Sequence, residues 1–247
     1  MVSSESVDAR KERLDDADFS GVRLHSPNFE GTRITDGSLR NADISGFIEG
    51  LRVNGVEVAP LVEAELDRRF PERVTLRAED PQGLAQAWAI IEGIWRVTVA
   101  RAQMLPEALL LERVDDEWSF VETLRHLIMA TDAWLLRMVR QVARPYHPWG
   151  LAGSFLTDPA SLGIDPDAKP SLTDVLVVRR ERMDAVKETI DALTREELER
   201  VCVPPDAPGH PDESHSVLEC LHVILNEEWE HNGYANRDLD ILEARSR

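Results

Sequence analysis

Four stretches of the chain repeat apolar residues every three or four positions, which is the spacing of a helix that buries one face. They cover residues 81–105, 119–143, 171–193 and 216–242. The connection between the second and third stretches is long, whereas helices in a compact bundle are usually joined by short loops. Four amphipathic helices with one long crossover predict a mainly α fold, a four-helix bundle over residues 81–247.

The starts of two of these helices are marked by a Ser-x-x-Glu capping box, in which each side chain satisfies a backbone N–H near the helix start. Ser119 with Glu122 forms one box, and Ser216 with Glu219 forms the other. The pattern therefore predicts helix starts at these two serines.

The connection over residues 144–170 is rich in proline and glycine and is interpreted as a lid or a crossover. Within it, Tyr146, His147 and Trp149 are candidates for lining a substrate pocket, and His147 is a candidate catalytic residue. Aromatic residues that anchor a long loop to the protein surface give the same pattern. Both interpretations remain open from the sequence.

Residues 17–46 follow a different rule, with a large apolar residue at every fifth position and mostly small residues two positions earlier. The apolar positions are Phe19, Leu24, Phe29, Ile34, Leu39 and Ile44. Segments such as ADFSG and NADISG resemble the pentapeptide-repeat family. The resemblance implies a short right-handed β-solenoid over residues 1–50, with the apolar residues pointing inward. Because repeats are stabilised by their neighbours, so short an array is interpreted as a structural or dimerising appendage, with DNA mimicry as the alternative.

Residues 51–80 are interpreted as a connector. The segment LRVNGVEV places Asn54 and Gly55 between alternating apolar residues, which is typical of a two-residue β-hairpin. Pro60 follows and predicts a short helix that ends at Pro71. The chain is thus expected to have three parts, residues 1–50, 51–80 and 81–247.

Composition and charge narrow the classes of partner. A hydrophobic content of 43% in 247 residues indicates a globular core. The net charge of −18, with no cluster of lysine and arginine, disfavours nucleic acids and anionic membranes as partners. Without an apolar stretch typical of a signal peptide or membrane span, we expect a cytoplasmic protein that acts on a small molecule and can form a homodimer.

The last helical stretch carries the candidate chemistry. Glu227 and His231 stand four residues apart, one above the other, along the edge of its apolar stripe. A half-buried carboxylate and imidazole are stabilised by a divalent metal, but a solvent-facing Glu/His pair has the same spacing. Glu228 is a rival ligand, because it stands three residues before His231.

The segments WSFVETLRHLIMATDAWL and NEEWEHNGYANRDL resemble the DinB superfamily over residues 81–245. Members are four-helix bundles that bind one divalent metal through a histidine of the second helix and two residues of the fourth. The branch that includes mycothiol-dependent maleylpyruvate isomerase has glutamate in place of one histidine. That resemblance implies the ligands His126, Glu227 and His231, and it favours Glu227 over Glu228.

The same resemblance implies a metal-dependent transferase or isomerase that uses a low-molecular-weight thiol such as mycothiol, and the ligand set favours zinc as the metal. Two imidazoles and one carboxylate leave metal positions open, as in catalytic zinc sites; nickel and iron are the other candidate metals. Tyr234, one turn beyond His231, is a candidate catalytic residue that hydrogen-bonds water or substrate. The opposing hypothesis is a non-enzymatic metal-bound scaffold that binds a partner through the N-terminal repeats.

Overall fold

The computed structural model describes residues 14–24, 27–153 and 156–245. The chain divides into two compact units, Met1–Ile48 and Glu49–Arg247. The larger unit contains all of the assigned helices and strands.

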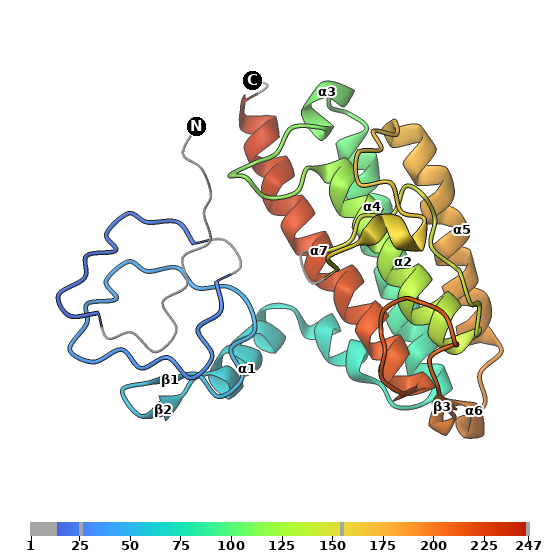
Figure 1. Cartoon of the computed structure of the whole chain (residues 1–247), viewed down its shortest axis with the longest axis horizontal. Coiled ribbons are helices and arrows are strands. Elements are labelled where there is room, and N and C mark those ends of the chain that lie inside the picture. The colour runs from blue at the N-terminus through green and yellow to red at the C-terminus, as the bar shows by residue number, and fades with distance from the viewer. Residues whose placement is uncertain (1–13, 25–26, 154–155, 246–247) are drawn as a thin grey trace. The chain divides into compact units, whose positions relative to one another are not determined.

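The larger unit is built from four long helical segments (Figure 1). They are α2 (Pro81–Ala102), α4 (Phe120–Thr131) with its π-helical continuation η2 (Asp132–Val139), α5 (Leu172–Asp191) and α7 (Val217–Arg245). Both α2 and α4 pack against α5 and against α7, so the four helices enclose one core. The mainly α prediction is confirmed.

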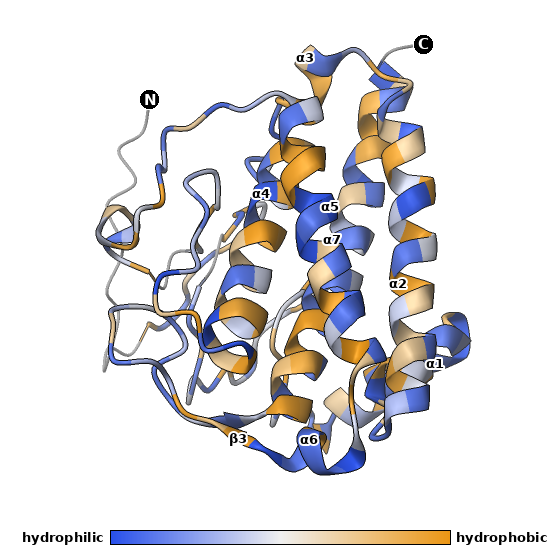
Figure 2. Ribbon diagram, turned by 90° about the vertical axis from the view of Figure 1, so that its right-hand side faces the viewer, coloured by the Kyte–Doolittle hydropathy of each residue, from blue (hydrophilic) through white to orange (hydrophobic). Residues whose placement is uncertain are grey.

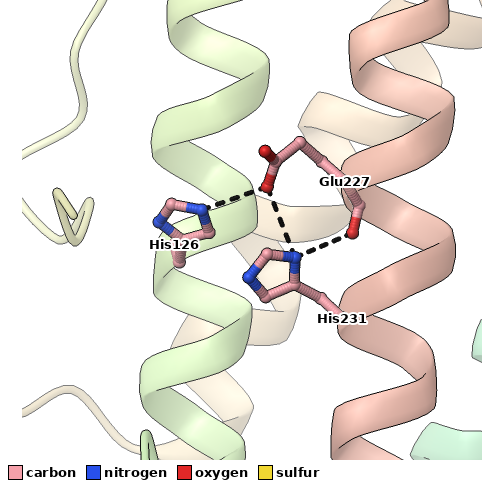
Figure 3. Close-up of side chains that lie close together, drawn as sticks. All are labelled: His126, Glu227 and His231. Carbon is pink, nitrogen blue, oxygen red and sulfur yellow. Dashed lines mark hydrogen bonds and ion pairs between the residues drawn. The ribbon is translucent and has the colours of Figure 1, made fainter. Parts of the chain in front are cut away.

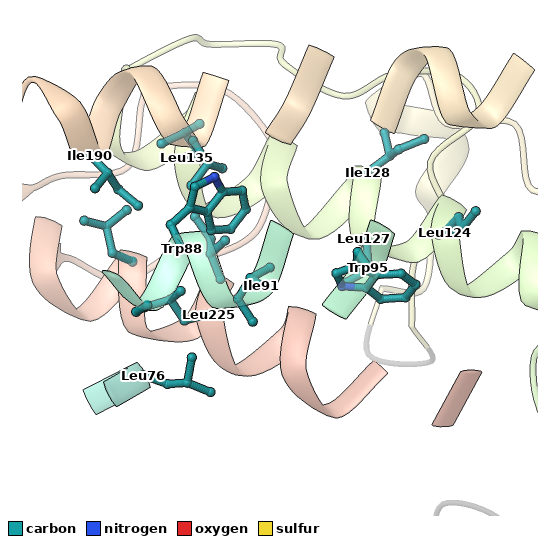
Figure 4. Packing of buried hydrophobic residues seen from close by; sticks show 14 of the residues in the cluster. Leu76, Trp88, Ile91, Trp95, Leu124, Leu127, Ile128, Leu135, Ile190 and Leu225 are labelled. Carbon is teal, nitrogen blue, oxygen red and sulfur yellow. The ribbon is translucent and has the colours of Figure 1, made fainter. Parts of the chain in front are cut away.

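The core lies where the apolar faces of these helices meet (Figure 2). Trp88 and Ile91 of α2, Leu127 and Ile128 of α4 and Leu225 of α7 are among its side chains (Figure 4). None of the five is more than 2% exposed, and burying each such side chain contributes about 1.5–3 kcal/mol. In the described part of the chain, no helix is long and apolar enough to cross a membrane.

Capping residues fix where these helices begin. The hydroxyl of Ser119 accepts from the backbone N–H of Glu122, whose carboxylate accepts from the backbone N–H of Ser119 at 2.8 Å. Ser216 and Glu219 make the same reciprocal pair at 3.1 and 2.7 Å. Both predicted capping boxes are confirmed. The helix ends differ from the predictions, because the second helix turns π-helical at Asp132 and stops before Ala143.

Shorter elements surround the bundle. They are β1 (Arg52–Val53), β2 (Val56–Glu57), α1 (Ala59–Arg69), η1 (Pro71–Arg77), α3 (Glu107–Leu110), η3 (Pro159–Leu162), α6 (Arg195–Glu199), β3 (Val201–Cys202) and β4 (His215–Ser216). The Asn-Gly hairpin is confirmed: Val53 pairs with Val56, and both Asn54 and Gly55 have positive φ, as a type I′ turn requires. The antiparallel pair β3–β4 was not predicted.

The smaller unit differs from its sequence-based prediction. Turns recur every ten residues, closed by hydrogen bonds such as Val22 N–H to Phe19 O and Thr32 N–H to Phe29 O. Residues 14–24 and 27–48 contain no β-strand, so the predicted β-solenoid is not found there. The six apolar repeat residues are 52–63% exposed instead of buried. An array of so few repeats lacks the neighbouring coils that would cover its apolar side chains.

Candidate metal centre

His126 of α4 meets Glu227 and His231 of α7 on one side of the bundle (Figure 3). One candidate ligand atom from each residue lies within 4.8 Å of the other two. His126 is buried, and the other two side chains are partly buried. The structure therefore brings together the three side chains singled out from the sequence, hereafter the His/Glu/His trio.

The orientation of His126 follows from its two ring nitrogens. Its Nδ1 lies 3.0 Å from the carbonyl oxygen of Leu151, and because a carbonyl only accepts, Nδ1 must carry the proton. In a neutral ring Nε2 then presents a lone pair, and it lies 3.2 Å from Oε2 of Glu227. Two acceptors at this distance need a proton or a metal cation between them. A backbone carbonyl on the second nitrogen is typical of metal-binding histidines.

His231 is held by the turn of α7 on which it lies. Its Nδ1 is 2.9 Å from the backbone oxygen of Glu227 and 3.3 Å from Oε2 of the same residue. Its Nε2 has no hydrogen-bond partner within the described chain. Burial, followed by the nearby His126, lowers the pKa of His231 to about 4. The ring is therefore neutral at pH 7, the protonation state that binds metals.

Glu227 supplies the negative charge of the trio. Burial opposes its ionisation, but the rings of His126 and His231, both within 3.3 Å of its Oε2, outweigh burial and lower its pKa. One carboxylate and two imidazoles are a donor set that suits zinc. Two ligand atoms on a tetrahedral zinc lie about 3.4 Å apart, since each is ~2.1 Å from the metal. The separation of 3.2 Å between His126 and Glu227 fits such an ion.

The long connection over residues 144–170 takes part in the site through its backbone. Arg125 of α4 donates to the carbonyl oxygens of Trp149 at 2.9 Å and Asp165 at 3.1 Å. The backbone N–H of Leu151 donates to the carbonyl of Arg125 at 3.1 Å. These bonds fix the Leu151 carbonyl against His126. The crossover thus orients a candidate ligand.

Glu228 has a different environment from Glu227. Its Oε2 pairs with Nη2 of Arg179 on α5 at 2.7 Å, and both side chains are no more than 4% exposed. The rival ligand therefore points to α5 and not to the histidines. Cys220, a buried thiol on the same helix, is also outside the trio, and burial raises its pKa to about 12.

Two aromatic rings flank the histidines. Tyr234 lies edge-on to His231 with ring centroids 5.6 Å apart, and its side chain is 41% exposed. Trp118 lies 4.6 Å from the ring of His126 and 6.2 Å from that of His231. The sequence interpretation missed Trp118. A usable signal was its place directly before the Ser119 cap, where an apolar residue packs on the helix that it precedes.

His147 has other neighbours. Its backbone N–H donates to Asp132 at 2.7 Å, and its Nδ1 accepts from the backbone N–H of Trp149 at 3.1 Å. Burial lowers its pKa. None of its contacts in the described chain reaches the trio, so a catalytic role for His147 stays a prediction.

Comparison with known proteins agrees with this geometry. A family model described as the DinB superfamily matches residues 90–235, which is more than half of the chain and includes all three residues of the trio. No curated protein and no solved structure matches the chain. Members of the superfamily often bind a divalent metal. The chain belongs to the DinB superfamily.

Proposed function

We propose that the His/Glu/His trio binds a divalent metal, with zinc favoured, and that the protein is a thiol-using transferase or isomerase for a small electrophile. One observation carries the metal site: Nε2 of His126 faces a carboxylate oxygen of Glu227 at 3.2 Å, a separation at which two acceptor atoms need a cation or a proton between them. A cation between the two atoms satisfies both lone pairs. Three protein ligands leave a coordination position for a further ligand, as in catalytic zinc sites.

A divalent metal held there would supply a Lewis acid that lowers the pKa of a bound thiol, so that thiolate is available at neutral pH. The protein keeps its ligands ready for this role. Leu151 holds His126 in one tautomer, and the backbone of Glu227 holds His231. These contacts reduce the reorganisation needed when a substrate binds.

Two aromatic rings lie beside the trio. Trp118 lies 4.6 Å from the ring of His126 and 6.2 Å from that of His231. The hydroxyl of Tyr234 has no hydrogen-bond partner in the described chain, and the partly exposed side chain lies beside His231. That hydroxyl is available to donate to the substrate.

The choice of thiol rests on the ligand pattern. A glutamate together with two histidines resembles the mycothiol-dependent branch of the superfamily, and mycothiol is the first thiol to test. The metal and the thiol are separate parts of the proposal and need separate experiments.

Metal binding is tested by elemental analysis of purified protein. We expect one divalent metal per chain, lost in the double variant His126→Ala/His231→Ala. His222→Ala is the matched control, because His222 lies on the same helix but bonds the carbonyl of Ala78 at 2.8 Å. Substoichiometric metal in wild type, or unchanged metal in the double variant, would rule out the site.

Catalysis is tested with a panel of thiols, mycothiol first, against generic small electrophiles. We expect Glu227→Gln to lower the rate about 10–100-fold, since a neutral amide weakens the metal site while nearly preserving its shape. Glu230→Gln removes a charge three residues away on the same helix and should leave the rate near wild type. Equal rates in wild type, Glu227→Gln and metal-stripped protein would exclude catalysis of the reactions tested.

A second candidate is a metal-bound scaffold, and one observation favours it. The smaller unit exposes large apolar side chains, of which Phe47 is fully exposed and Ile34 and Ile44 are each 63% exposed. Exposed large apolar side chains that form a contiguous patch mark interaction surfaces. Metal binding without any thiol activity, together with self-association that is lost on deleting residues 1–48, would favour this function over the enzyme.

A further inference from the structure

Asp132 is a fully buried carboxylate that links the long connection to the bundle. It is the first residue of η2, directly after α4, and it is 0% exposed. Its Oδ1 accepts from Nε of Arg182 on α5 at 2.7 Å. Its Oδ2 accepts from the backbone N–H of His147 at 2.7 Å. Because a buried carboxylate is stable only when its oxygens are hydrogen-bonded, this arrangement holds His147 against the bundle.

A short series of hydrogen bonds connects His147 to the candidate metal ligand His126. Nδ1 of His147 accepts from the backbone N–H of Trp149 at 3.1 Å, and its carbonyl oxygen accepts from the N–H of Gly150 at 2.9 Å. The next residue is Leu151, whose carbonyl oxygen lies 3.0 Å from Nδ1 of His126. The place of the Leu151 carbonyl therefore depends on the place of His147.

The turn over residues 147–151 packs closely on α4. A Cβ added at Gly150 would lie 3.2 Å from the carbonyl oxygen of His147 and 3.3 Å from Cβ of Met129 on α4. The second distance is shorter than the optimum of about 3.5–4.0 Å between carbon atoms. A side chain at residue 150 would therefore displace the turn. Glycine lets the turn approach α4, the helix on which His126 stands.

We propose that Asp132 and His147 are positioning residues for the metal site. They hold the turn so that the Leu151 carbonyl keeps the proton of His126 on Nδ1 and leaves Nε2 for a metal. The inference rests on the proposed metal site, and it gives His147 a different role from the catalytic one predicted from the sequence. An acceptor on the second nitrogen fixes the tautomer and ring orientation of a metal-binding histidine.

The first test is Asp132→Asn in the full-length protein. Asparagine has nearly the same shape, but its amide must place a donor against either the guanidinium of Arg182 or the N–H of His147. Solvent exchange of the His126 Nδ1–H is followed by NMR in metal-free protein. The measurement is made at pH 7.5, where Asp132 is ionised, because burial raises its pKa to about 6. We expect exchange about tenfold faster or more, relative to the backbone N–H of Ile91 in the core.

Zinc affinity is measured on the same variant. We expect it to fall about 10–100-fold, as for loss of a group that orients a metal-binding histidine. If wild type itself binds no zinc, the proposed function fails, while the exchange measurement still tests whether Asp132 holds His126. Unchanged exchange of the His126 Nδ1–H would overturn the inference. Equal acceleration at His126 and Ile91 would also overturn it, because the effect would then be a general loss of stability.

His147 allows a comparison between positioning and catalysis. His147→Ala removes the acceptor for the Trp149 N–H, whereas His147→Asn replaces it, because an asparagine oxygen accepts from the N–H two residues later. Asp165 makes the same type of bond to the N–H of Asp167 at 3.0 Å. We expect zinc affinity to fall about tenfold or more in His147→Ala and to stay within about twofold of wild type in His147→Asn. Equal losses would contradict the positioning role, because the imidazole itself would then be required.

Two further variants complete the set. Gly150→Ala displaces the turn from α4 without changing Asp132 and should also speed exchange of the His126 Nδ1–H. Asp158→Asn is the matched control, because it removes a carboxylate from the same connection but keeps an acceptor for the N–H of Ser161. It should leave exchange and zinc affinity unchanged, and an effect equal to that of Asp132→Asn would contradict the inference. If Asp132→Asn does not fold, unchanged exchange in Gly150→Ala is the contradicting result.

Discussion

Glu227 and Glu228 are adjacent on α7, yet their charges are compensated in opposite ways. Glu228 is 1% exposed and pairs with Arg179, a group that stays charged at any ordinary pH. Glu227 is partly exposed and faces two histidines, whose charge depends on a proton. Because Arg179 carries a permanent charge, Glu228 forms a structural ion pair with it. The histidines beside Glu227 are neutral when unprotonated, so a metal cation can bind between them and the carboxylate.

The Glu228–Arg179 pair is itself incomplete. Among the residues that the structure describes, Oε1 of Glu228 and Nη1 of Arg179 have no hydrogen-bond partner. Burial raises the pKa of Glu228 even though Arg179 opposes this. A buried pair of this kind adds little net stability but is costly to break from one side.

The largest expected effect is therefore the removal of Arg179. Arg179→Met leaves a fully buried carboxylate without its partner and should lower the free energy of unfolding by about 3–5 kcal/mol. Urea denaturation of metal-free protein measures the change. Arg180→Met, at an exposed neighbouring position, should change stability by less than about 0.5 kcal/mol.

A double variant decides between charge and packing as the cause. Arg179→Met/Glu228→Leu removes both charges and should recover most of the lost stability, because no buried charge remains. If the double variant is as unstable as Arg179→Met alone, then lost packing and not the unpaired carboxylate explains the effect.

Much of the fold was predictable because its determinants are local. The Ser119 and Ser216 capping boxes and the Asn54-Gly55 turn each act within a few residues, and all three are found. The five-residue period near the N-terminus also produces local turns. Strand pairing between coils depends on neighbours that six repeats do not provide, which is why the predicted solenoid was wrong.

The candidate site was predictable only in part. Helical spacing placed Glu227 above His231, but a helical-wheel projection alone could not decide whether Glu227 or Glu228 is the ligand. The deciding partner, Arg179, lies on a different helix, and distances across a bundle are not contained in one helix's period. The link to His126 came from family resemblance. The roles of Trp118 and the Leu151 carbonyl required three-dimensional structure.

Acidification should change the free energy of unfolding in opposite directions through His231 and through Glu228. The pKa of His231 is about 4 in the folded protein and ordinarily 6.5, so the unfolded chain binds this proton first. Stability should fall as pH drops from 6.5 towards 4, by up to ~1.4 kcal/mol per pH unit. Glu228 has a raised pKa, so its protonation on acidification favours the folded state.

The contribution of His231 to the pH dependence of stability is obtained as the difference between wild type and a variant without this imidazole. Unfolding of metal-free wild type and His231→Asn is measured across the same pH range, so that the other titrating groups cancel. We expect a shallower loss of stability in the variant below pH 6.5. Parallel curves would show that His231 is protonated alike in both states, and the proposed burial effect would be wrong.

The smallest expected change in stability is that of Glu227→Gln in metal-free protein. Removing this charge ends the unfavourable burial of a carboxylate but also ends its attraction to the two histidines, so the two effects nearly cancel. The new amide can donate to Nε2 of a neutral His126 ring, which lies 3.2 Å from the present oxygen. We expect the free energy of unfolding to change by less than about 1 kcal/mol. For Glu228→Gln we expect a loss of about 3 kcal/mol or more, because that substitution leaves the buried charge of Arg179 without its partner.

The metal content of the two variants should show the reverse order, with a large loss in Glu227→Gln and little loss in folded Glu228→Gln. Urea denaturation and elemental analysis of the two variants measure both quantities. A large loss of stability in Glu227→Gln, with metal content unchanged, would mean that Glu227 is a structural residue and that the trio is not the metal site.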